Sequence, residues 1–127
     1  MGTRLRKFGA GLAAFMLATT GASIFTASPA VAAVPCGPSA PDKDTRIAQT
    51  VNKDPRFPLG VQMRTGPGLN CDPIVRVPWE AWVDLNCFRR GDSVNGVTTW
   101  SAVRFAQHFG WISDYHLSGQ GSNFNCG

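Results

Sequence analysis

The residues in this chain with the most chemistry to offer are its four cysteines, Cys36, Cys71, Cys87 and Cys126. A cysteine can serve as a catalytic nucleophile, as a zinc ligand or as half of a disulfide. No two of them form the Cys-x-x-Cys pair that is typical of zinc sites. An even number of cysteines in a small chain with an export signal instead predicts a disulfide framework.

Four cysteines allow three disulfide pairings. We favour Cys71 with Cys87, which would tie neighbouring strands, and Cys36 with Cys126, which would fasten both ends of the mature chain. By the loop-entropy relation the shorter bridge contributes roughly 3 kcal/mol and the longer roughly 4.5 kcal/mol. Together they would supply a large share of the stability typical of a domain.

Catalytic patterns other than cysteine are weak in this sequence, which contains no Gly-x-Ser-x-Gly elbow, His-Glu-x-x-His helix or phosphate loop with its lysine. Bridged cysteines leave no thiolate for His108 or His116 to activate. Asp114 and His116 would be two metal ligands on one strand face, but a third is not evident. Glu80 and Asp84 are weak candidates for a general acid and base, because both lie among ordinary surface residues in the sequence. We therefore expect no enzyme, no metal and no cofactor.

Aromatic side chains are the other group suited to binding, and Trp79, Trp82, Trp100, Trp111 and Tyr115 are many for a small domain. Their rings offer a large contact area with few rotatable bonds, which suits a peptide or glycan site. We expect Trp100 and Trp111 to be at least half structural. For Trp79, Trp82 and Tyr115, packing and the lining of an exposed groove stay equally open.

An extended peptide lying across these rings would also need polar groups that fix its ends. The candidates for that role are Asp84, Asn86 and Arg104.

The first 33 residues have the composition of a cleavable export signal. Three basic residues near the start are followed by an apolar stretch over 8–20 and by small residues that end at Ala32 and Ala33. Cleavage after either alanine fits the pattern. Gly, Ser, Thr and Pro interrupt the apolar run, which disfavours a membrane anchor. We expect a secreted protein, extracellular or associated with the cell wall, that is free of the membrane once the signal is removed.

The charge of the mature chain is small, because removing residues 1–33 lowers the formal net charge from +4 to +1. A near-neutral domain without a basic stripe is not expected to bind nucleic acid. We expect a monomer whose partner is a cell-wall peptide or an extracellular protein.

The mature chain divides into an arm and a β-rich part. Residues 34–59 contain five prolines, which predicts an extended arm, although Asp44 could cap a short helix over 45–52. Residues 60–117 carry short runs rich in Val, Ile, Trp and Phe, punctuated by turn residues about every ten positions. This pattern predicts a barrel or sandwich.

The clearest strand covers 81–88, where Ala81, Val83, Leu85 and Cys87 alternate with polar or aromatic residues and form the expected core face. The dipeptide Asn95-Gly96 predicts a type I′ hairpin turn, with 98–105 as the returning strand. A last short strand is expected over 109–113, followed by a turn over 114–117.

Four stretches resemble the bacterial SH3 family: residues 60–68, 74–77, 99–104 and 110–117, the last with the Gly-Trp-Ile and Tyr-His-Leu elements. The cysteines and the Gly-Asp-Ser-Val-Asn-Gly stretch are similar to versions in secreted actinobacterial proteins. The turn Val77-Pro78-Trp79-Glu80-Ala81 departs from the glycine turn common in the family. The resemblance implies a small half-open barrel of five to seven strands and recognition of cell-wall peptides or proteins through an aromatic-lined groove.

The expected architecture is therefore all-β and stapled by disulfides. It comprises a signal peptide (1–33), a Pro-rich arm (34–59), an SH3-like half-open barrel (60–119) and a tail (120–127). The favoured function is a secreted binding module. An exported inhibitor that presents the disulfide-held loop 87–96, with Arg89 and Arg90, to a foreign enzyme is the alternative. Cell-wall hydrolysis ranks third, because no catalytic domain is attached.

Overall fold

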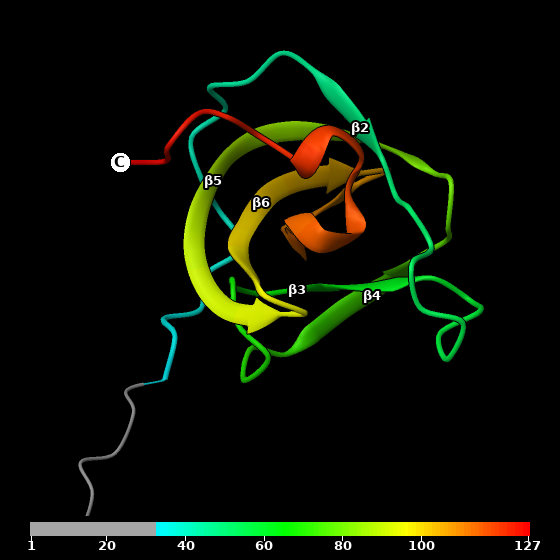
Figure 1. The fold of residues 1–127 in the computed structure, drawn as a ribbon. Helices are drawn as coiled ribbons and strands as arrows, with labels where there is room; N and C mark the ends of the chain where they lie inside the picture. Colours follow the sequence, from blue (N-terminus) through cyan, green and yellow to red (C-terminus); the bar gives the residue numbers. More distant parts are fainter. Residues whose placement is uncertain (1–32) are drawn as a thin grey trace, which may run out of the picture. The chain divides into compact units, whose positions relative to one another are not determined.

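The computed structural model describes residues 33–127, which form an all-β half-barrel of six antiparallel strands (Figure 1). The predicted signal peptide lies outside the described residues, apart from Ala33. The sheet order is β2-β5-β6-β7-β3-β4, which falls within the expected five to seven strands. The strands are β2 (Ile47–Gln49), β3 (Val61–Arg64), β4 (Pro73–Val77), β5 (Trp82–Val94), β6 (Val97–Phe105) and β7 (His108–Ser113).

The strand β5 is the longest element within residues 33–127 and curls around the barrel (Figure 1). Val83 and Leu85 are buried inside, as the alternation predicts. An irregularity between Leu85 and Cys87 inserts Asn86 into the pairing with β6, so that Leu85 lies opposite Val103 and Cys87 opposite Ala102. One extra residue reverses the face that a strand presents. The expectation that Cys87 shares the core face of Val83 and Leu85 is therefore wrong.

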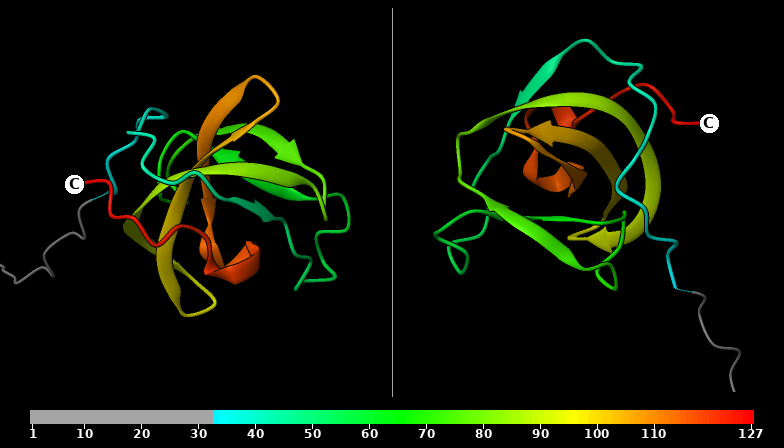
Figure 2. Two further views of the ribbon diagram at one scale, coloured as in Figure 1. Left: turned by 90° about the horizontal axis from the view of Figure 1, so that it is seen from above. Right: turned by 180° about the vertical axis from the view of Figure 1, so that it is seen from behind.

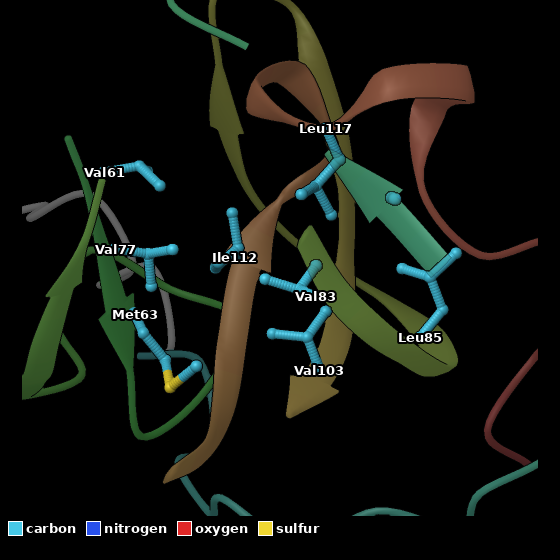
Figure 3. Packing of buried hydrophobic residues seen from close by; sticks show 9 residues of the cluster. Val61, Met63, Val77, Val83, Leu85, Val103, Ile112 and Leu117 are labelled. Atoms are coloured by element: carbon cyan, nitrogen blue, oxygen red, sulfur yellow. The ribbon is translucent and has the colours of Figure 1, made fainter. Parts of the chain in front are cut away.

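Two apolar clusters result from this change of face. The inner cluster fills the barrel (Figure 3) and consists of Ala48, Val61, Met63, Val77, Val83, Leu85, Val103, Ile112 and Leu117. The outer cluster lies on the other face of the sheet and consists of Cys87, Trp100, Ala102, Trp111 and Cys126. A sheet with both faces apolar must be covered on both sides.

The Pro-rich arm and the C-terminal tail cover the outer cluster. Both segments cross the outside of β5 (Figure 2), where Lys43 N donates to Asn86 O and Cys126 N donates to Phe88 O. The arm also accepts a hydrogen bond of 2.6 Å from Trp111 Nε1 at Gly37 O. Arm and tail are therefore integral parts of the folded domain.

The disulfides join this covering layer to the barrel. They pair Cys36 with Cys71 and Cys87 with Cys126, and no cysteine is free. The expected pairs, Cys71 with Cys87 and Cys36 with Cys126, are wrong. The reason is the irregularity in β5, which points Cys87 outward towards the tail, and the path of the arm, which brings Cys36 to the loop between β3 and β4.

The segment expected as a helix over 45–52 contains the strand β2 instead. The Asp44 carboxylate does accept the backbone N–H of Arg46, two residues on, together with Nε and Nη2 of the same arginine, but a strand follows instead of a helix. Ala48 lies opposite Val83 of β5 and is buried. On its other side Gln49 N donates to Ser118 Oγ. Tertiary contacts on both sides of β2 therefore override the weak local preference of this segment for a helix.

The hairpin prediction is confirmed. Asn95 and Gly96 have φ values of 49° and 88°, the positive values that a type I′ turn needs. They connect β5 to β6, and β7 follows close to the expected last strand. The closing turn is the 3-10 helix η4 (Asp114–His116), followed by η5 (Ser118–Gln120). Residues 87–94 belong to β5, so the contact loop expected over 87–96 is a strand with a two-residue turn.

The two disulfides should contribute unequally to stability. Each closes a loop of similar length, 35 and 39 residues apart, and so contributes about 4 kcal/mol by loop entropy. Only Cys87–Cys126 is buried at both ends, so its removal also loosens the packing around Trp100 and Trp111.

We expect the Cys87→Ala/Cys126→Ala variant to lose more unfolding free energy in urea than the Cys36→Ala/Cys71→Ala variant. The former should also increase the exposure of tryptophan to an aqueous quencher. Equal losses would contradict the assignment of the buried bridge to the outer cluster.

Candidate functional site

Two of the predicted groove tryptophans are core residues. Trp100 and Trp111 are 2 % and 0 % exposed, and their indole N–H groups donate to the backbone oxygens of Asp92 and Gly37. The guanidinium of Arg89 lies 5.5 Å from the Trp111 ring centroid and covers it further. Neither ring presents its face to a ligand.

Trp82 lies on the outer face of β5, opposite Gln49, and is 58 % exposed. Ile47, its diagonal neighbour on β2, is also exposed. Trp82 lines none of the clefts described below.

Asp84 and Arg104 are cross-strand partners on β5 and β6 and form an ion pair. They line a cleft of about 840 Å³ beneath the arm, together with Asp42, Arg46 and Phe109. Polar and apolar side chains line this cleft in similar measure, and two of its three carboxylates, those of Asp44 and Asp84, already have an arginine partner. Asn86, the third polar candidate, is 7 % exposed at its edge.

Trp79 is placed by the turn between β4 and β5. Thr50 clamps that turn, because its Oγ1 donates to Pro78 O, its Oγ1 accepts from Ala81 N and its backbone oxygen accepts from Glu80 N. Glu80 has a φ of 64°, in the left-handed region that glycine would fill more easily. The clamp turns Trp79 back towards the end of the arm, where its Nε1 donates to Phe57 O.

An aromatic group forms around Trp79. The ring of His116 lies 5.4 Å from Trp79 and 4.9 Å from Tyr115, the latter in an edge-on arrangement. Lys53 Nζ lies 4.9 Å from the Tyr115 ring. Burial lowers the pKa of His116, so this imidazole is neutral at pH 7. Asp114 and His116, considered as metal ligands, face different neighbours, and residues 33–127 contain no cluster of three metal-ligating side chains.

Trp79 and His116 line a second cleft of about 330 Å³, bounded by the end of the arm, β3 and the tip of the β5–β6 hairpin. Phe57 and Leu69 are exposed on its walls, and the buried Trp100 also belongs to its lining. We call it the Trp79 cleft. Its lining residues are Asp54, Arg56, Phe57, Gly60, Val61, Gln62, Arg64, Leu69, Arg76, Trp79, Ser93, Val94, Asn95, Trp100, Ser113 and His116.

The predicted groove residues therefore separate. Of these, Trp79 lines the Trp79 cleft with a half-buried ring that also packs against the inner cluster, Tyr115 borders a neighbouring hollow beside Lys53, and Asp84 and Arg104 lie in the larger cleft beneath the arm. Sequence reasoning missed Phe57, Leu69, Arg64 and Arg76. The sequence signal for Phe57 was a large aromatic side chain, the only one in the Pro-rich stretch 34–59.

A network of buried polar side chains connects Asp114 of η4 to Ser101, Ser122 and Asp44. Ser101 Oγ donates to Asp114 Oδ1 at 2.6 Å and accepts from Ser122 N at 2.8 Å. Ser122 Oγ donates to Asp44 Oδ2, also at 2.8 Å, and Asp44 is paired with Arg46. The network connects the arm, β6, η4 and the tail, so these carboxylates act in holding the domain together.

The chain matches no protein-family model, no curated protein and no solved structure. Within residues 33–127 no helix has the length and apolar character needed to cross a membrane.

The two buried carboxylates predict opposite responses to pH. The pKa of Asp44 is lowered to about 2, chiefly by the hydrogen bonds from Arg46, so its contribution is present above the usual carboxyl pKa and is lost as the pH falls towards 2. Burial raises the pKa of Asp114 to about 6. The folded state then holds a proton that the unfolded state has released, so the unfolding free energy falls as the pH rises from about 4 to 6.

We expect Asp114→Asn to remove that fall, which amounts to about 3 kcal/mol. The asparagine keeps an oxygen that can accept from Ser101 without burying a charge. Urea unfolding of both proteins between pH 4 and 7 measures the difference. A difference in stability between the two proteins that does not change with pH across this interval would show that the Asp114 carboxylate is better solvated than its 3 % exposure indicates.

Proposed function

We propose that this protein is a secreted, non-catalytic binding module of the bacterial SH3 type, which holds a cell-wall peptide in the Trp79 cleft. The observation that supports it best is the cleft itself. It brings together a half-buried tryptophan, two exposed apolar side chains and several polar groups in about 330 Å³, the lower end of the range for ligand sites.

Secretion is supported by two independent features. The export-signal pattern over residues 1–33 precedes a domain whose four cysteines are all bridged, and disulfides persist in oxidising, extracellular compartments.

A rigid domain loses little conformational entropy when it binds, which favours recognition of a short peptide.

The walls of the cleft are held by the fold on both sides. The Thr50 clamp holds the Trp79 turn, and the Cys36–Cys71 disulfide holds the loop that carries Leu69. Because both walls are held in place, the cleft keeps its shape before a ligand binds. The bound peptide would lie along β3 with its apolar side chains against Trp79 and Phe57.

The inhibitor alternative would use Arg89 and Arg90 on β5. Both guanidinium groups already have contacts within the domain, Arg89 with the Trp111 ring and Arg90 Nη1 with Thr98 Oγ1. The cleft therefore has the stronger support, and a soluble protein partner remains an outcome of the test below.

The test is retention of the mature, oxidised protein on purified peptidoglycan, beside an unrelated exported domain of similar charge. Phe57→Ala should reduce retention roughly tenfold, because aromatic anchors are among the minority of contacts whose truncation costs more than about 1 kcal/mol of binding free energy. Phe124→Ala is the matched control, since both phenylalanines are 48 % exposed and Phe124 lies outside the clefts described above.

Trp82→Ala should likewise bind as the wild type does, because Trp82 lies away from the cleft. Loss of retention with Trp82→Ala but not with Phe57→Ala would move the site to the outer face of β2 and β5. No retention above the unrelated domain would refute cell-wall binding.

A further inference from the structure

The Trp79 cleft carries an uncompensated positive charge. Its charged lining residues are Asp54, Arg56, Arg64 and Arg76, while His116 is neutral. Asp54 is paired with Arg56 at 2.7 Å, and hydrogen bonds from that arginine hold the pKa of Asp54 at about 2. This pair is neutral as a unit, which leaves the two other guanidinium groups.

Arg64 and Arg76 have no carboxylate within ion-pair distance among residues 33–127. Each uses one Nη1–H on a backbone oxygen, Arg64 on Cys71 O at 3.0 Å and Arg76 on Gly60 O at 3.2 Å. A guanidinium has five N–H donors, so both retain donors for a ligand. Asp92, the carboxylate bound to Leu69 N, is not part of the lining.

The strand register places the two arginines on one face. On β3, Val61 and Met63 point into the barrel, so Gln62 and Arg64 point outward. Arg76 of β4 is the cross-strand partner of Gln62 and therefore shares this face. The Gln62 side chain makes no hydrogen bond to any other described residue and can pair with a peptide amide.

We infer that the ligand of the Trp79 cleft is an anionic peptide, which places a carboxylate on Arg64 and Arg76 and an apolar side chain against Trp79 and Phe57. The inference rests on the proposed function, since it names the ligand class of the same cleft. Guanidinium groups match carboxylates in geometry and charge, and the apolar wall excludes water from the contact. A neutral peptide would leave both arginines without a counter-charge.

The test uses two probes that differ only in charge: N-acetyl-Leu-Ala-Glu with both carboxylates free, and the isosteric N-acetyl-Leu-Ala-Gln amide. Each is titrated into the ¹⁵N-labelled mature, oxidised protein, and the shifts of the Trp79 indole N–H and the Gly60 and Gln62 amides are followed. We expect the acid to bind at least tenfold more tightly than the amide, and its affinity to fall with added salt.

Arg64→Gln and Arg76→Gln should each reduce the affinity for the acid roughly tenfold and leave the affinity for the amide unchanged. Arg90→Gln is the matched control, because Arg90 is exposed, bonds only a neutral oxygen among the described residues and lies outside the cleft. Unchanged ¹⁵N spectra outside the substituted position show that each variant is folded.

Equal affinity for the acid and the amide, or no saturable shifts with the acid at millimolar concentration, would overturn the inference. Either result can be distinguished from a failure of the proposed function, which is decided separately by retention on peptidoglycan and its loss in Phe57→Ala. A protein that is retained on peptidoglycan but does not discriminate the probes would keep its function and lose the charge requirement.

Discussion

The irregularity at Asn86 in β5 is the constraint on which the rest of the domain depends. It lets one strand contribute Leu85 to the barrel interior and Cys87 to a second cluster on the opposite face. A single small barrel cannot cover both faces of its own sheet, so the arm and the tail must lie over Trp111 and Trp100. The disulfides attach these covering segments where the chain has too little apolar surface to hold them by packing alone.

Buried polar contacts, like the disulfides, join the arm and the tail to the barrel. The carboxylates of Asp44 and Asp114 are both buried, but their environments differ, since Asp44 has a guanidinium partner and Asp114 has only hydroxyl donors. Burying an unpaired carboxylate is costly, which is why the pKa of Asp114 is raised while that of Asp44 is lowered. The close approach of Gly121, whose position leaves no room for a Cβ beside Asp114 Oδ1, shows how tightly the tail is packed there. Arm, barrel and tail therefore form one cooperative unit.

The Trp79 cleft is a consequence of this same arrangement. Because the arm must cross the outside of β5 and enter the sheet as β2, it arrives at β3 through the segment that carries Asp54 and Phe57. Thr50 then joins the arm to the turn before β5, and Trp79 is directed towards Phe57. The proposed site is built from segments that are distant in the sequence, and its walls owe their positions to contacts that also stabilise the fold.

The sequence by itself determined what local patterns determine: the all-β class, the Asn95-Gly96 hairpin and the existence of two disulfides. Period-two alternation and turn chemistry act over a few residues, so they can be read without a fold. Only the tertiary structure decided the disulfide partners and the strand identity of Ile47–Gln49, because both depend on register with distant segments. The Trp79 cleft also depends on the tertiary structure, because its lining comes from segments that are distant in the sequence. Its arginines are ordinary surface residues until β3 pairs with β4 and the arm closes beside them, which no short-range pattern specifies.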